Sequence, residues 1–297
     1  MERSSREPHL AGQSQLRKTV SREIRVILGR LNHRYRMATA HRRAFPDFII
    51  VGAQKAGTSS VYYYLRQHPR LVPSYRKEIH FFDGGLDPNV DAYAKGVAWY
   101  RAHFPTVRQL GGDRKAFEAS PLYLFNPLAP ARIADSLEEV KLIAVLRDPV
   151  ERTISNYFYE RRAGREPLPI MEALAQEEAR VRPALEAQDY KHPEFIHHSY
   201  KGRSLYDEQL KRYLKYFDRS SLLVMSSDLL FAKPSEALRR VFQFVGVDSG
   251  VAISDLKPRN IGTNKGRVEP QVYEYLQEFF RPHNERLYEL VGEDCGW

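Results

Sequence analysis

The stretch DFIIVGAQKAGTSS, from Asp47 to Ser60, decides the fold and organises the rest of the chain. Its apolar run, residues 48–51, predicts a short buried strand. A glycine-bounded loop, Gly52 to Gly57, follows it, and the hydroxyl residues 58–60 open a helix. The unpaired amides of such a loop and helix start converge on one point, and the helix dipole favours an anion there. Because Lys55 adds a full positive charge, the stretch predicts a phosphate-binding site.

The loop is close to a Walker A motif but does not satisfy it. That motif, G-x-x-x-x-G-K-[ST], needs a lysine directly after the second glycine and a hydroxyl that holds magnesium. The spacing of Gly52 and Gly57 fits, but Thr58 stands at the lysine position and the lysine comes earlier, at Lys55. A purely structural strand-to-helix turn is the alternative interpretation of the loop alone.

Composition predicts one large globular domain in a reducing compartment. The chain has 297 residues, of which 42% are hydrophobic, enough for a full core. Its one cysteine, Cys295, allows no intramolecular disulfide, which favours a cytoplasmic location. We find no apolar run near the ~20 residues of a membrane span and expect no secretory signal.

The net charge of +9 is concentrated in a leader. Residues 1–45 hold eleven Lys or Arg against three Glu, whereas residues 46–297 are almost neutral. This distribution argues against a nucleic-acid-binding core. Apolar residues recur in the leader at helical spacing between arginines: Leu16, Val20, Ile24, Ile27, Leu28 and Leu31. We expect a basic helix that docks on the body, contacts an acidic partner or lies on an anionic membrane.

Residues 46–297 predict an α/β domain with three layers around a mainly parallel sheet. The run VKLIAVL, Val140 to Leu146, is continuously apolar, as in a parallel strand covered on both faces. Further strands are predicted at 115–120 and 221–225. Helices are predicted at 58–68, 130–137, 149–161, 170–189, 205–217, 234–245 and from about 270 to 290.

Ligands of such sheets bind beyond the carboxyl ends of the strands. There Arg147 ends one strand, and Ser155 lies about two turns into the next helix, so both could bind a second phosphate. Glu78 and His80 are two residues apart on a segment predicted to be extended, which would put both side chains on one side. A carboxylate and an imidazole near Lys55 suggest a general base with its helper.

Five motifs of the chain together resemble those of a known protein family. GAQKAGTSS, KEIHFFD, KLIAVLRDPVERTISNY, KGRVEP and FFRPHNERLYELVGEDCGW, in that order, resemble the sulfotransferases, and most closely the heparan sulfate and related glycan sulfotransferases. The resemblance covers about residues 46–297. It implies 3′-phosphoadenosine 5′-phosphosulfate (PAPS) as sulfuryl donor, adenosine 3′,5′-bisphosphate (PAP) as product, and no metal.

The resemblance also implies roles for individual residues. Glu78 matches the catalytic base, with His80 and Asp83 beside it, and Lys55 would stabilise the leaving group. Arg147 and Ser155 match the pair that binds the 3′-phosphate. Two segments match the loops that hold the 5′-phosphosulfate and close over the donor: Lys55, Ala56, Gly57, Thr58 and Ser59, then Thr263, Asn264, Lys265, Gly266 and Arg267.

The acceptor is left open, as a glycan or a small-molecule alcohol. Ala119 stands where the animal glycan enzymes commonly have a lysine, and their paired cysteines are missing, which favours a soluble relative of bacterial type. Two other functions remain as alternatives. One is a small-molecule kinase, and the other is a non-catalytic protein recruited through its basic leader.

Overall fold

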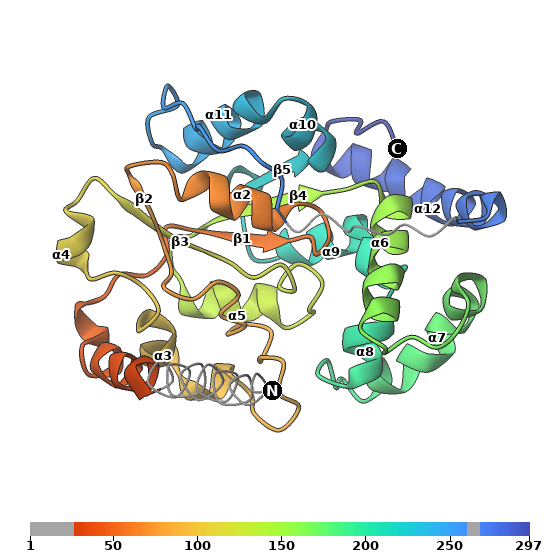
Figure 1. Ribbon diagram of the computed structural model, residues 1–297, viewed down its shortest axis with the longest axis horizontal. Helices are drawn as coiled ribbons and strands as arrows, with labels where there is room; N and C mark the ends of the chain where they lie inside the picture. Colours follow the sequence, from red (N-terminus) through yellow and green to blue (C-terminus); the bar gives the residue numbers. More distant parts are fainter. Residues whose placement is uncertain (1–26, 260–267) are drawn as a thin grey trace, which may run out of the picture.

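The computed structural model describes residues 27–259 and 268–297 and is built on five parallel strands. In sheet order β2-β3-β1-β4-β5, these are Leu71–Pro73, Lys115–Ala119, Phe48–Gly52, Lys141–Leu146 and Leu222–Ser226. Neighbouring strands pair in parallel throughout, and Figure 1 shows helices above and below them. The predicted α/β class and parallel sheet are therefore confirmed.

The sheet is buried on both faces, as its unbroken apolar runs require. In β1, Phe48 and Ile50 pack toward one cluster, and Ile49 and Val51 pack toward the other. The first cluster also holds the buried faces of α2, Thr58–Leu65, and α11, Pro234–Val245. The second holds those of α5, Ala129–Ser136, and α9, Tyr206–Tyr213. Figure 1 shows α11 above the strands and α5 below them.

The remaining helices surround this three-layer core. They are α3 Val97–Arg101, α4 Val107–Leu110, α6 Pro149–Arg162, α7 Ile170–Glu186, α8 Pro193–His198, α10 Ser227–Ala232 and α12 Pro270–Val291, with short 3-10 turns at Ala40–Arg42, Tyr93–Lys95, Gly202–Ser204 and Arg219–Ser221. No helix in the described residues is long and apolar enough to cross a membrane.

The order of the strands fixes where a ligand can bind. After β1 the chain crosses to one side of the sheet, and β4 is then added on the other side of β1. Loops that leave β1 and β4 therefore diverge and open a crevice between them, the usual binding place in such sheets. The glycine loop leaves β1, and Arg147 leaves β4.

The end of the leader is docked in an unexpected orientation. Residues 27–38 are helical, and the Arg36 guanidinium donates to the carbonyls of Ala102 and Phe104 at 2.6 and 2.7 Å. The apolar row Ile27, Leu28, Leu31 and Tyr35 is instead 54–64% exposed. A basic side chain thus holds this helix on the body, and its apolar residues face outward.

Candidate functional site

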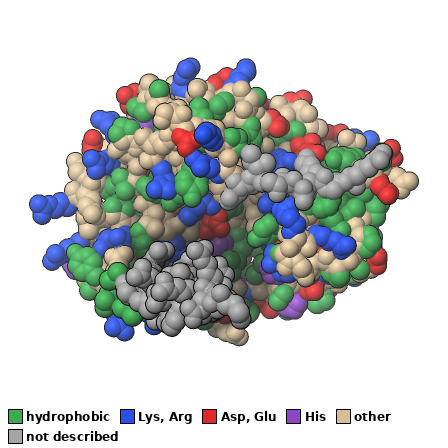
Figure 2. All heavy atoms as spheres, viewed as in Figure 1, with side chains coloured by type: hydrophobic (Ala, Val, Ile, Leu, Met, Phe, Trp, Pro, Cys, Tyr) green, Lys and Arg blue, Asp and Glu red, His purple; other side chains and the backbone are tan. Residues whose placement is uncertain are grey.

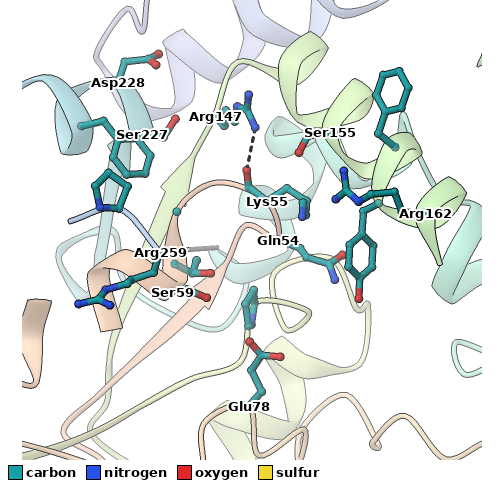
Figure 3. A pocket seen from close by; sticks show the side chains of 17 residues that line it. Gln54, Lys55, Ser59, Glu78, Arg147, Ser155, Arg162, Ser227, Asp228 and Arg259 are labelled. Carbon is teal, nitrogen blue, oxygen red and sulfur yellow. Dashed lines mark hydrogen bonds between the residues drawn. The ribbon is translucent and has the colours of Figure 1, made fainter. Parts of the chain in front are cut away.

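A cavity of about 550 Å³ lies at the predicted crevice and contains most of the predicted site. Lys55, Gly57, Thr58, Ser59, Glu78, Arg147 and Ser155 all line it. Figure 3 shows Arg147 and Ser155 on one side of the Lys55 loop and Glu78 on the other. On the surface, Figure 2 shows a central hollow with acidic and histidine side chains inside and basic side chains around it.

The anion loop joins β1 to α2 through a turn that needs glycine. Gly57 is the N-cap of α2 and has φ 96°, in the left-handed region, where a side chain would be strained. A Cβ there would also come within 2.9 Å of the Phe231 ring. Thr58 and Ser59 then start the helix at the cavity wall. The first turn of a helix points its backbone amides toward the N-terminal end, and here that end faces the cavity, where the amides can bind an anion.

Lys55 lies among other cations. Its Nζ is 4.6 Å from the centre of the Tyr159 ring. Burial lowers the pKa of Lys55, and the positive charges of Arg162 and Arg147 lower it further. A bound anion would relieve this repulsion, which is the electrostatic signature of an anion site.

Arg147 lies between the end of β4 and the start of α6. Its guanidinium donates to the Lys55 carbonyl at 3.3 Å and pairs with Glu151 at 3.0 Å. Asp148 caps α6 by accepting from the Val150 and Glu151 amides. Ser155, two turns along α6, faces the same cavity. The predicted second anion contact, Arg147 with Ser155 after β4, therefore lies in the same cavity as the Lys55 loop, which follows β1.

The segment that carries Glu78 and His80 is not extended, so that prediction was wrong. Both residues have left-handed backbones, with φ 57° and 55°. The segment is shaped by bonds to the end of β3, because Glu78 N donates to the Ala119 carbonyl and His80 N to Ser120 Oγ. Their side chains still meet, with His80 Nε2 3.8 Å from Glu78 Oε2.

The charges of this segment are strongly coupled. The fully buried carboxylate of Asp83 accepts a hydrogen bond from His80 Nδ1 at 2.6 Å. Burial opposes a charged imidazole, but the Asp83 and Glu78 carboxylates outweigh it and raise the pKa of His80 to about 9. His80, and next the Lys77 ammonium, outweigh burial and lower the pKa of Glu78 to about 2. Glu78 is therefore a carboxylate, and His80 an imidazolium, near neutral pH.

A buried glutamate, Glu118, is linked to this segment through hydrogen bonds. Glu118 on β3 accepts from the hydroxyls of Tyr100, Ser120 and Tyr123 at 2.7, 2.9 and 3.3 Å. Tyr123 in turn accepts from the Phe81 amide. Burial prevails over these bonds and raises the pKa of Glu118 to about 7.

Sequence reasoning missed part of the cavity wall. Phe158, Tyr159 and Arg162 on α6, Ser227, Asp228 and Phe231 on α10, and Gln54, Pro121, Pro258 and Arg259 also line it. A signal was available for the α6 residues, since positions 155, 158, 159 and 162 share one helical face. Ala56 is buried and does not line the cavity. Thr263 to Arg267 lie outside the described residues.

Comparison with known proteins identifies the family. Residues 45–279 match the sulfotransferase domain family. Heparan sulfate glucosamine 3-O-sulfotransferase 6 of Homo sapiens is 34% identical over 279 residues, which cover 86% of this chain and 75% of that protein. A sulfotransferase of Alicyclobacillus acidocaldarius, solved by crystallography, superposes with a TM-score of 0.68 at 32% identity, covering 85% of this chain and 98% of that one.

A more distant relative, the membrane-associated sulfotransferase kil1 of Dictyostelium discoideum, is 26% identical and covers 85% of this chain and 66% of that protein. The family match decides against the kinase and the non-catalytic alternatives. This chain belongs to the sulfotransferase domain family and is a PAPS-dependent sulfotransferase.

Proposed function

We propose that this enzyme transfers the sulfuryl group of PAPS to a hydroxyl of a glycan or of a small-molecule alcohol, with Glu78 as general base. The observation that carries the proposal is the single cavity lined by Glu78, Lys55 and Arg147, which come from three separate segments. A base, a cation for the leaving group and a second anion contact are then within reach of one bound donor.

In this proposal the donor lies across the loop. The backbone amides of residues 56–59, the hydroxyls of Thr58 and Ser59, and the ammonium of Lys55 hold the 5′-phosphosulfate. Arg147 and Ser155 hold the 3′-phosphate, because a guanidinium offers paired donors to phosphate oxygens. The Arg147–Glu151 pair supports this role, since it keeps the guanidinium beside the cavity until a phosphate competes for it. We assign the closing loop to Thr263–Arg267.

The reaction then needs one proton transfer and one exchange of bonds at sulfur. The acceptor oxygen attacks sulfur in line, its proton passes to Glu78, and the bond from sulfur to the phosphate oxygen breaks. PAP leaves with the electron pair, and Lys55 stabilises that charge. General-base help of this kind is worth about 10²–10⁴ in rate. His80, fixed by Asp83, faces Glu78 and orients the carboxylate.

The heparan sulfate enzyme among the relatives supports a glycan acceptor without excluding other alcohols. The transfer test uses ³⁵S-labelled PAPS with a panel of desulfated glycans, neutral sugars and simple alcohols. We expect the wild type to label at least one acceptor, and we expect Glu78→Gln to transfer label at least about 10²-fold more slowly. PAP should bind the variant as it binds the wild type. Equal transfer by Glu78→Gln would disprove the base assignment.

We also propose that residues 1–45 form a leader, separate from the catalytic domain 46–297, that contacts an anionic membrane from the cytoplasmic side. The outward apolar residues Leu28 and Leu31 support this, as does the leader's net charge of +8. Flotation with anionic vesicles should carry the protein, and Leu28→Asp with Leu31→Asp should abolish it. Binding to acidic polypeptides but not to vesicles would favour the acidic-partner alternative.

A further inference from the structure

Lys77 lies between the proposed base and the anion loop. Its Nζ donates to Ser59 Oγ at 3.1 Å and forms a close ion pair with Glu78 Oε1. The side chain is 21% exposed and runs past the Tyr62 ring, which lies 5.9 Å from Nζ. One ammonium thus contacts a residue of the phosphosulfate loop and the carboxylate that faces the acceptor.

This arrangement places a cation beside each oxygen of Glu78. Lys77 holds Oε1, and His80 Nε2 lies 3.8 Å from Oε2. A base that is to accept a proton from a hydroxyl must present an oxygen within hydrogen-bond reach of it. A hydroxyl that approaches Glu78 therefore meets a cation beside either oxygen, and withdrawal of one cation makes that oxygen the stronger acceptor.

Lys77 is the partner that can move. His80 is fixed from its other nitrogen by the buried carboxylate of Asp83, and its backbone amide donates to Ser120. The ammonium of Lys77, in contrast, is a point charge on a flexible stem of four carbons with three rotatable donors. It already contacts Ser59, which lines the cavity where the sulfuryl group would lie.

We propose that Lys77 is a second sulfuryl-binding cation that exchanges Glu78 for the donor. When PAPS binds, the ammonium moves onto a sulfuryl oxygen and releases Glu78 Oε1 to the acceptor hydroxyl. During transfer the acceptor oxygen bonds to sulfur, its proton goes to Oε1, and PAP departs with the electrons of the broken bond. Lys77 stays on the transferred group. This inference rests on the proposed function and adds a step that couples donor binding to the base.

The electrostatics of the donor-free site agree with this exchange. After His80, the Lys77 ammonium is the partner that keeps the pKa of Glu78 low, at about 2. A carboxylate so stabilised has little affinity for a proton, and a base works best with a pKa near the working pH. Withdrawal of Lys77 removes one of the two cations and makes Glu78 a stronger base at the moment when the donor is in place.

The test compares Lys77→Met and Lys77→Arg with the wild type, and Lys95→Met is the matched control because Lys95 contacts Trp99 away from the cavity. PAP lacks the sulfuryl group, so Lys77→Met should bind PAP within about threefold of the wild type. It should bind PAPS at least tenfold more weakly, and single-turnover transfer should fall at least 10²-fold. Lys77→Arg should keep most of the PAPS preference because it keeps a cation. Lys95→Met should change none of these values.

Three outcomes would overturn the inference. Lys77→Met could bind PAPS and transfer sulfuryl like the wild type, it could weaken PAP and PAPS equally, or Lys77→Arg could lose the PAPS preference completely. The last comparison holds even if Lys77→Met does not fold. Glu78→Gln is measured in the same series. Normal transfer by Lys77→Met with loss in Glu78→Gln refutes the exchange alone, and normal transfer by both refutes the proposed base as well.

Discussion

Gly57→Ala tests the geometry of the anion loop with little change in chemistry. Gly57 has φ 96°, and a residue with a Cβ in the left-handed region is strained by roughly 1–2 kcal/mol. The new methyl would also lie 2.9 Å from Phe231 Cζ and 3.2 Å from Leu230 Cδ2. Phe231 is 45% exposed, so its ring can turn away from the new methyl group. Because the ring lines the cavity, that movement would change the shape of the cavity wall.

Gly246→Ala is the matched control. Gly246 ends α11 with φ 76°, and its Cβ would meet only Lys115 Cε at 3.9 Å, an ordinary contact. Both variants should lose about 1–2 kcal/mol of stability, or roughly 2–8 °C in Tm, from the backbone strain. Gly57→Ala should in addition bind PAP at least about tenfold more weakly, since misaligned amides give up hydrogen bonds worth about 1 kcal/mol each.

Calorimetry with PAP and thermal unfolding measure the two effects separately. If Gly57→Ala binds PAP as tightly as Gly246→Ala does, the loop amides do not hold the donor and the reasoning fails. A loss of PAP affinity in Gly246→Ala would likewise show that strain far from the cavity explains the effect.

Two further predictions concern Arg147 and Glu118. Arg147→Ala should weaken PAP binding about 10–150-fold, because it removes a charge-assisted hydrogen bond worth about 1.5–3 kcal/mol. The affinity for 5′-AMP, which has no 3′-phosphate, should stay within about threefold of the wild-type value. Equal losses for both nucleotides would mean that Arg147 does not bind the 3′-phosphate. Arg182→Ala, which breaks an exposed pair with Glu178, is the control for both ligands. The pKa of Glu118 is raised to about 7 in the fold, so its contribution to stability is complete below about pH 4.5 and disappears as the pH rises through 7. Urea unfolding should show a pH-dependent loss of up to about 3 kcal/mol across this range in the wild type and a smaller one in Glu118→Gln; identical profiles would mean that Glu118 is not the titrating group.

The sequence predicted those parts of the fold whose local pattern already matches the tertiary environment. β3, β4, β5 and α11 were found within about a residue because buried parallel strands are continuously apolar and amphipathic helices have a clear period. β2 was missed, since it has only three residues, Leu71–Pro73, and ends in proline. Proline is tolerated there because β2 is an edge strand, which only the sheet order reveals.

The residues of the site likewise fall into those that the sequence predicted and those that it did not. Lys55 and Arg147 follow strands, so the rule for parallel sheets located them from the sequence. The backbone of Glu78 and His80 could not be predicted, because bonds to Ala119 and Ser120, about 40 residues away, impose it. Phe231 and Arg259 reach the cavity from later segments that carry no motif. Their contribution depends on how α10 and the chain after residue 250 pack on the anion loop.

The central claim is that the cavity recognises a nucleotide by two separate phosphate positions. Competition calorimetry on the wild type, with PAP, 5′-AMP and ATP with Mg²⁺, tests it most directly. The account predicts that PAP binds at least about tenfold more tightly than either competitor, because only PAP reaches both Lys55 and Arg147. ATP binding as tight as PAP binding, or tighter, would contradict the account.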